Sequence, residues 1–369
     1  MDTEVNQHEL QMDIMNLYPF EVESITLLTN KSGRTTWKIE TAQGVKILKR
    51  VVMKPARMLL IAEAHEHLQE KGLPIARIHR TRAGAICVGA GKSAYVLYDL
   101  QQGKEVLYYD KAQMLNIMEF IGAFHHTSQG YMPDEMSKKR SRLGKWHKLF
   151  RWKLQELEGN KMLALKSDQE NNLPAPAVID PDAEQTWLQD PFSKMVIETI
   201  DEMILRGKQA LQELDAGQYD QWTLECIESR MFCQQDFTLA RFIETEEGLS
   251  MKELHSITSD LPSRDLRVIL NKMMKKMSVW DSDLVVELLR TYDKIHPLTK
   301  DQYKVLWTDL KFPHLYCSIV HKYFLGQKTS WSDEKYIWAL QNIVSVEQSK
   351  QEFLSNFEEF YSKIKAQGG

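Results

Sequence analysis

The sequence predicts an α+β protein of two lobes, a small β-rich N-terminal lobe at residues 1–102 and a larger, mainly helical C-terminal lobe at residues 103–369. Two patterns indicate this division. β-rich runs separated by turn sequences fill most of the N-terminal part, and they enclose a single main helical stretch. Beyond Gly103 the apolar residues recur almost wholly at helical spacing. Hydrophobic residues make up 43% of the chain, which is enough for a large buried core.

The predicted N-terminal lobe opens with a short amphipathic helix around Asp13–Leu17. A helix is predicted over Pro55–Lys71, because apolar side chains recur at helical spacing and Gly72 is a natural helix-ending residue. The β-rich runs around it give the order three strands, one helix, two strands. These runs are Ser24–Leu28, Thr35–Thr41, Val45–Val52, Ala76–Arg80 and Ala94–Tyr98.

The predicted C-terminal lobe consists of long helical segments joined by loops. A polar, Pro-rich stretch between Gln155 and Trp187, S-D-Q-E-N-N-L-P-A-P-A-V-I-D-P-D-A-E, is predicted to be a surface loop. The helical segments are Ala112–His126, Trp187–Leu214, Leu266–Met277, Leu284–Tyr292 and Lys300–Phe324.

Composition and local patterns argue against several classes of protein. The formal net charge is −4, so nucleic acid is not an expected partner. The four cysteines form no C-x-x-C pair and no His/Cys cluster with zinc spacing, which favours buried thiols in a reducing compartment. The N-terminus M-D-T-E-V-N-Q-H-E-L lacks the basic and apolar regions of a Sec signal. No apolar run is long enough to span a bilayer, so we expect no membrane insertion.

Residues 232–241, F-C-Q-Q-D-F-T-L-A-R, have the spacing of a phosphotransferase catalytic loop. Phosphoryl transfer uses an Asp that receives the acceptor's proton and an Asn five residues later that holds Mg²⁺. Asp236 stands at the position of the base, but Arg241 replaces the Asn and Gln234 stands where a His is expected. An arginine brings a cation and no acceptor, so this loop is predicted to have lost a metal ligand. The same charge could replace the ion in neutralising phosphate.

Residues 252–267, K-E-L-H-S-I-T-S-D-L-P-S-R-D-L-R, have the form of the metal-binding loop of such an enzyme. Glu253 replaces the expected Asp, and His255 stands where a second acid is common, on what is predicted to be a strand. We therefore expect no metal site. Asp265 is intact at the start of a predicted helix, where it is expected to brace the catalytic loop and favour the helix N-terminus. Arg241 is predicted to point towards Glu253, because carboxylates without a metal need a cation.

Lys49 is the candidate nucleotide-binding lysine. It lies in G-V-K-I-L-K-R, where strand alternation places Ile47 and Lys49 on one face and Lys46 on the other. Its partner acid is expected on the following helix, at Glu63 or Glu66, which are three residues apart and share a face. The alternative interpretation is a solvated lysine and solvated acids.

Residues 137–153, S-K-K-R-S-R-L-G-K-W-H-K-L-F-R-W-K, are basic and aromatic with no acid. A helix is predicted from about Gly144. One interpretation is an amphipathic helix with a solvated charged face. The other is a docking site, for which an acidic protein partner is favoured over a phosphorylated partner or nucleic acid. Trp146, Phe150 and the stem of Lys153 should pack inward, whereas Lys145, Lys148 and Arg151 should form a basic face.

These motifs, and nearly the whole chain, resemble the CotS family, a group of aminoglycoside-phosphotransferase-like proteins from spore-forming bacilli. The most specific stretches are Lys138–Asn160, Phe232–Arg241 and Lys252–Arg267, extended by S-V-W-D at Ser278–Asp281 and H-K-Y-F-L at His321–Leu325. The resemblance implies a bilobal protein-kinase-like fold and a role in building the spore coat, after synthesis in the mother-cell cytoplasm. Other members, such as the CotI type, keep H-Q-D, an Asn and an Asp-x-Asp loop. This chain departs from them at Gln234, Arg241, Glu253 and His255.

The leading hypothesis is therefore a pseudokinase scaffold of the spore coat, with other coat proteins as partners through Lys145, Lys148 and Arg151 and with no required cofactor. An alternative is an active, atypical phosphotransferase that uses Asp236 as base, with Lys49 and Glu253 as further working parts, and modifies coat proteins or a small hydroxylated metabolite. A third is ATP binding without catalysis, which would lock the two lobes for assembly.

Overall fold

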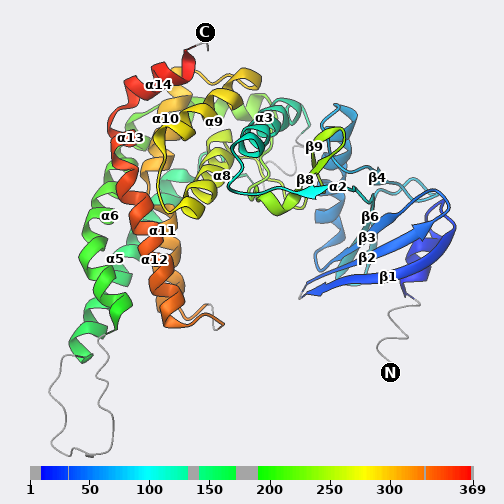
Figure 1. Cartoon of the computed structure of the whole chain (residues 1–369), viewed down its shortest axis with the longest axis horizontal. Coiled ribbons are helices and arrows are strands. Elements are labelled where there is room, and N and C mark those ends of the chain that lie inside the picture. The colour runs from blue at the N-terminus through cyan, green and yellow to red at the C-terminus, as the bar shows by residue number, and fades with distance from the viewer. Residues whose placement is uncertain (1–9, 32, 132–140, 172–189, 328–329, 367–369) are drawn as a thin grey trace, which may run out of the picture. The chain divides into compact units, whose positions relative to one another are not determined.

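The computed structural model describes residues 10–31, 33–131, 141–171, 190–327 and 330–366 (Figure 1). Two compact units are distinguished by the density of their internal contacts. The first comprises Met1–Ser141 and Ser229–Ser259, and the second comprises Arg142–Glu228 and Asp260–Gly369. The boundary predicted after Gln102 divides the lobes by chain order and stays a prediction. No helix among the described residues is both long and apolar enough to cross a membrane.

The first unit is built on a six-stranded antiparallel sheet in the order β1-β2-β3-β6-β4, with β5 paired to β6. The predicted order was three strands, one helix and two strands, and the structure adds only the short β5 after the helix. Helix α2 ends just before Gly72, whose φ of +83° suits a glycine. The elements are β1 (Val22–Lys31), β2 (Arg34–Thr41), β3 (Lys46–Val51), α2 (Pro55–Glu70), β4 (Ile78–His79), β5 (Val88–Ala90) and β6 (Ser93–Asp99).

One face of this sheet is covered by the N-terminal helix. Residues 10–16 are helical, as the sequence predicted. Strand β2 alternates buried and partly exposed residues along its length, which directs Trp37 and Ile39 to the covered face. Ile14, Met15 and Tyr18 pack there with Leu48 and with residues of β6. The hydrophobic face therefore fixes the register of β3, the strand that carries the candidate lysine, against its neighbours.

The rest of the first unit surrounds the candidate catalytic loop. It contains α3 (Lys111–Thr127), the short helix η1 (Leu239–Arg241) and a three-stranded sheet of β7 (Lys104–Glu105), β8 (Phe242–Thr245) and β9 (Gly248–Met251). Phe124 of α3 meets Phe232 and Phe237 edge-to-face, with ring centroids 5.6 and 5.2 Å apart. These aromatic contacts attach the loop to α3 on both sides of Asp236.

The second unit is helical. Helices α5 and α6 run side by side in Figure 1, and α11 packs against α5. Its helices are α5 (Trp146–Asn171), α6 (Pro191–Ala216), α7 (Tyr219–Glu228), α8 (Pro262–Met277), α9 (Ser282–Ile295), α10 (Lys300–Lys311), α11 (His314–Phe324), α12 (Asp333–Ser349), α13 (Gln351–Ser355) and α14 (Phe357–Lys365).

Two helix predictions need correction. A single helix over Lys300–Phe324 is wrong, because α10 ends at Lys311 and α11 begins at His314. Pro313 lacks a backbone N–H and forces the preceding Phe312 into an extended conformation, with ψ at 127°. Helix α5 also continues to Asn171, beyond the start of the predicted polar loop. The remainder of that stretch, at 172–184, lies outside the described residues, as do residues 187–189 of the helix predicted over Trp187–Leu214.

Candidate functional site

Most of the predicted site residues lie in the first unit. Lys49 sits in β3, where it pairs with Thr36 of β2 on one side and Val96 of β6 on the other. Arg241 ends the short helix η1. Glu253 and His255 lie in the loop after β9, which ends at Met251, so the predicted strand at Glu253 is wrong. Alternation therefore does not govern the directions of these two side chains.

The structure brings Lys49, Arg241 and Glu253 together. The ammonium of Lys49 donates to Oε1 of Glu253 in an ion pair. Nη1 of Arg241 lies 3.6 Å from the same oxygen. The three side chains are only 13–18% exposed. The prediction that Arg241 points towards Glu253 and pairs with an acid there is confirmed.

The acids on α2 have other partners than the one expected. Glu63 accepts a hydrogen bond from Tyr131 Oη at 3.3 Å. Glu66 forms an ion pair with Arg80, whose Nε donates to Glu66 Oε1 at 2.7 Å. The partner that the structure gives Lys49 is Glu253, whose carboxylate takes the place expected for Glu63 or Glu66.

His65, which lies between those two acids in the sequence of α2, was not predicted as a site residue. The backbone N–H of Leu254 donates to its Nδ1 at 3.2 Å, and its Nε2 donates to the carbonyl of Ala76 at 2.6 Å. These partners fix the neutral tautomer, and complete burial lowers the pKa of His65 to about 4. His65 thus ties α2 to the residue that follows Glu253. The sequence does not predict this link, because a histidine on an apolar helix face is common and does not indicate which distant residue it contacts.

His255 is also held neutral. Burial, reinforced by the positive charges of Arg241 and Arg34, lowers its pKa to about 3. Its Nδ1 lies 3.4 Å from Nε2 of Gln234, the residue that replaces the expected His of the catalytic loop. Because both nitrogen-bearing groups are uncharged at neutral pH, this corner of the site adds no positive charge of its own.

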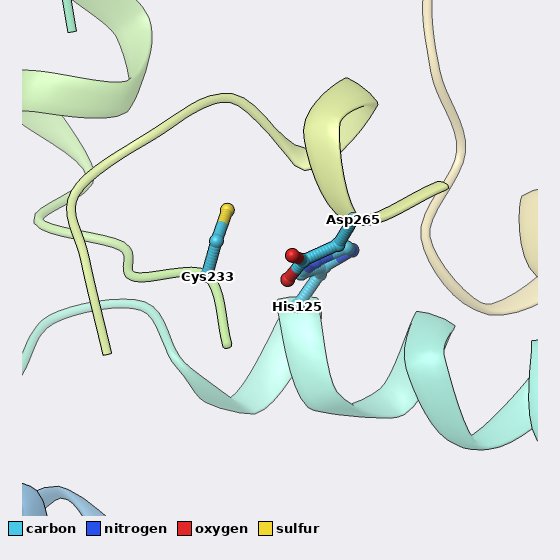
Figure 2. Close-up of side chains that lie close together, drawn as sticks. All are labelled: His125, Cys233 and Asp265. Carbon is cyan, nitrogen blue, oxygen red and sulfur yellow. The ribbon is translucent and has the colours of Figure 1, made fainter. Parts of the chain in front are cut away.

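The catalytic loop is anchored by backbone bonds and exposes its Asp. Cys233 exchanges two hydrogen bonds with Thr258, at 2.8 and 3.0 Å. Asp236 is exposed, and the residue before it, Gln235, has a φ of +78°, a strained value for a side-chain-bearing residue. Figure 2 labels Cys233 in this loop and His125 on α3, and both side chains are buried.

Asp265 belongs to the second unit, where it is buried in the first turn of α8 and labelled in Figure 2. An acid in this turn suits the positive end of the helix dipole. Its predicted role in bracing the catalytic loop stays a prediction.

A cavity of about 390 Å³ opens beside the Lys49–Glu253 pair. This volume lies in the range of small-molecule sites. The cavity is lined by β2, β3, residues 98–101 and the segment around Ile243 and Lys252. A second hollow beside the pair, lined by Arg34, Met58 and His255, has only about 10 Å³ of free space. A ligand of nucleoside size would therefore fit the first cavity and not the second.

The donor set around Glu253 does not fit a Mg²⁺ ion. Magnesium requires several oxygen ligands in octahedral order. Here the Glu253 carboxylate faces two cations, Lys49 and Arg241. Arg241 supplies only donors at the position where the catalytic loop is expected to carry the amide oxygen of an Asn.

Comparisons with known proteins give one family and one fold. A family model described as "Spore coat putative kinase YutH" matches residues 183–357. Spore coat protein S of Bacillus subtilis (strain 168) is 54% identical over 362 residues, covering 98% of this chain and 97% of that protein.

Solved structures show the same fold at low sequence identity. The aminoglycoside phosphotransferase from Alicyclobacillus acidocaldarius has a TM-score of 0.73 at 16% identity, covering 94% of each chain. A spectinomycin phosphotransferase in complex with AMP has a TM-score of 0.59 at 11% identity, covering 93% of this chain and 98% of that one. The predicted kinase-like, aminoglycoside-phosphotransferase fold is thereby confirmed.

Proposed function

The chain belongs to the spore coat protein S family, and from this membership we propose that it is a component of the spore coat that acts as a pseudokinase scaffold. The family relationship covers nearly the whole chain, so it applies to both units. We further propose that the protein is made in the mother cell, takes part in coat assembly and needs no cofactor for that role.

The observation that carries the pseudokinase part is the ion cluster of Lys49, Arg241 and Glu253. In a phosphotransferase the corresponding lysine and acid bind phosphates and metal. In this chain the two groups neutralise each other, and Arg241 adds a further cation. This arrangement supports a site that has replaced metal binding with an internal ion cluster.

The basic face of α5 is the proposed contact with other coat proteins. Helix α5 begins at Trp146, two residues later than predicted, and Trp146 and Phe150 are buried. Lys145 and Lys148 are exposed, and Arg151 is exposed beside Asp215, with Nη2 3.2 Å from a carboxylate oxygen. Residues 137–140 of the basic segment lie outside the described residues. An acidic partner would complement this charge.

Coat placement can be tested in sporulating Bacillus subtilis that lacks its own spore coat protein S. The chain is expressed from that protein's promoter, and spores are washed and extracted. We expect it in the extracted coat fraction and around the forespore by fluorescence. Purely soluble recovery would refute the coat proposal, provided that spore coat protein S of the parent strain, fractionated in parallel, appears in the coat fraction as the positive control.

A second function, phosphoryl transfer by an atypical mechanism, is favoured by two observations. Asp236 is intact and exposed, and a cavity of about 390 Å³ opens beside Lys49. Such an enzyme would use Asp236 as base and act on a coat protein or a small hydroxylated metabolite. ATP turnover by the pure protein, abolished by Asp236→Asn, would establish this function in place of the pseudokinase.

A further inference from the structure

Arg241 is a buried cation with incomplete pairing. Its side chain is 14% exposed, and its Nη1 approaches Glu253 at 3.6 Å, which is longer than a direct hydrogen bond. Its Nε is buried and has no hydrogen-bond partner among the described residues. A largely buried guanidinium whose Nε has no hydrogen-bond acceptor is costly, so this position favours a bound anion.

Two more cations act on the same place. Lys49 contacts the shared carboxylate of Glu253. Arg34 lines the hollow beside that pair. Burial is the main cause of the lowered pKa of Arg241 and of His255, and the positive charge of Arg34 lowers both pKa values further. The acids that act on Arg241 are Glu253 and the exposed Asp236. Three cations thus face two carboxylates, which leaves a local excess of positive charge.

We propose that Arg34, Lys49 and Arg241 form an oxyanion site that binds a polyphosphate without a divalent cation. In this site Arg241 supplies the charge that a metal supplies elsewhere, and the Glu253 carboxylate is an internal occupant that the ligand displaces. Guanidinium groups suit this role, because they bind phosphate oxygens in a two-pronged manner. The polyphosphate is either free or carried by a nucleoside, for which the adjacent cavity of about 390 Å³ has room.

The assignment differs from metal-dependent nucleotide binding in a measurable way. A Mg²⁺–triphosphate complex carries less negative charge than the free triphosphate, and it would bring a second cation next to Arg241. Magnesium should therefore weaken binding instead of promoting it. Because the proposal concerns only this site, it can fail while the coat placement stands.

The test uses the full chain in thermal-shift and calorimetric titrations. The ligands are sodium triphosphate, ATP and adenosine, each in EDTA and in excess Mg²⁺, at matched ionic strength. We expect triphosphate and ATP to raise the melting temperature in EDTA, and Mg²⁺ to reduce their affinity several-fold. Equal affinities for triphosphate and ATP would identify free polyphosphate as the ligand class. Markedly tighter binding of ATP than of triphosphate would identify a nucleotide. Absence of binding in EDTA, or binding that requires Mg²⁺, would overturn the proposal.

Two substitutions with opposite expected effects separate the site from general electrostatics. Arg241→Gln should weaken triphosphate binding by about tenfold or more, because it removes a charge-assisted contact. Glu253→Gln should strengthen it, because the competing carboxylate is gone. Lys92→Gln, on the exposed turn between β5 and β6, removes one positive charge elsewhere and should change nothing. If Arg241→Gln does not fold, the gain in Glu253→Gln still decides. Weaker or unchanged binding in that variant would contradict the displacement.

Discussion

Arg241 approaches Glu253 with its Nη1 atom 3.6 Å from Oε1, and Lys49 pairs with that same oxygen. One carboxylate is therefore shared by two largely buried cations. Removing it in Glu253→Ala leaves both cations uncompensated, so we expect the free energy of unfolding to fall by about 2–4 kcal/mol. Urea unfolding measures this loss. Glu40→Ala, which breaks the more exposed pair with Lys38 on β2, is the control and should cost less than about 1 kcal/mol. If the two variants lost the same free energy of unfolding, the cluster would add no more stability than an exposed ion pair.

His65 predicts a pH dependence of stability. Its folded pKa of about 4 lies below the ordinary value near 6.5, so its contribution is complete above pH 6.5 and is lost as the pH falls towards 4. Protonation turns Nδ1 into a donor, which can no longer accept from Leu254. We expect His65→Gln to show a flatter fall in stability than the native chain between pH 6.5 and 4.

The stability profile comes from chemical unfolding at a series of pH values, with His126→Gln on the exposed face of α3 as the matched control. The difference between variant and native chain isolates His65 from the other titrating groups. If the profile for His65→Gln ran parallel to the native one, the pKa of His65 would not be lowered in the folded state, and the prediction would be wrong.

A buried charge cluster in the second unit gives another prediction. Glu347 accepts from Arg206 Nη2 at 2.7 Å and from Lys350 Nζ at 3.0 Å, and all three side chains are at most 5% exposed. Truncating Glu347 to Ala leaves two buried cations, so we expect a loss of about 3–5 kcal/mol. Glu352→Ala, an exposed acid on the next helix, should stay within about 0.5 kcal/mol. Equal melting temperatures for the two variants would contradict the importance of this cluster.

Local sequence patterns were sufficient for much of the fold and little of the site's pairing. Alternation in β3 placed Lys49 correctly beside Ile47, since a strand repeats every two residues. The approach of Arg241 to Glu253 followed from charge balance alone. By contrast, Lys49 selected Glu253 instead of an acid on α2, and His65 reached Leu254 across 189 positions of sequence. Such pairings depend on how distant segments pack, which no local periodicity encodes.

The same limit explains the cluster in the second unit. Glu347 and Lys350 lie three residues apart on a sequence that resembles an ordinary solvated helix face. Their burial comes from tertiary packing of this end of α12 against α6, α8 and α10. The helix break at Pro313 was different, because the proline was visible in the sequence. The apolar spacing continues across it, and that continuity masked the break.

The basic face of α5 yields the last prediction. Lys148 is exposed, and Arg151 forms an exposed pair with Asp215, whereas Trp146 donates from Nε1 to the buried Asp260 at 2.8 Å. The exposed charges therefore lie on one face of the helix, and the side chain that packs into the core lies on another. The double substitution Lys148→Glu and Arg151→Glu should impair incorporation into the coat while lowering stability by no more than about 1 kcal/mol, since exposed substitutions cost little.

Coat extraction and thermal unfolding are measured together for this variant. Lys194→Glu with Lys208→Glu, on exposed positions of α6, makes the same change of net charge and should incorporate normally. Association of the native chain with an acidic coat protein should also weaken with salt, because exposed charges are screened over about 8 Å at physiological ionic strength. Normal incorporation of the α5 variant would reduce the basic face to a solvated surface. Unfolding of that variant would instead assign Lys148 and Arg151 a structural role and remove the support for docking through this helix.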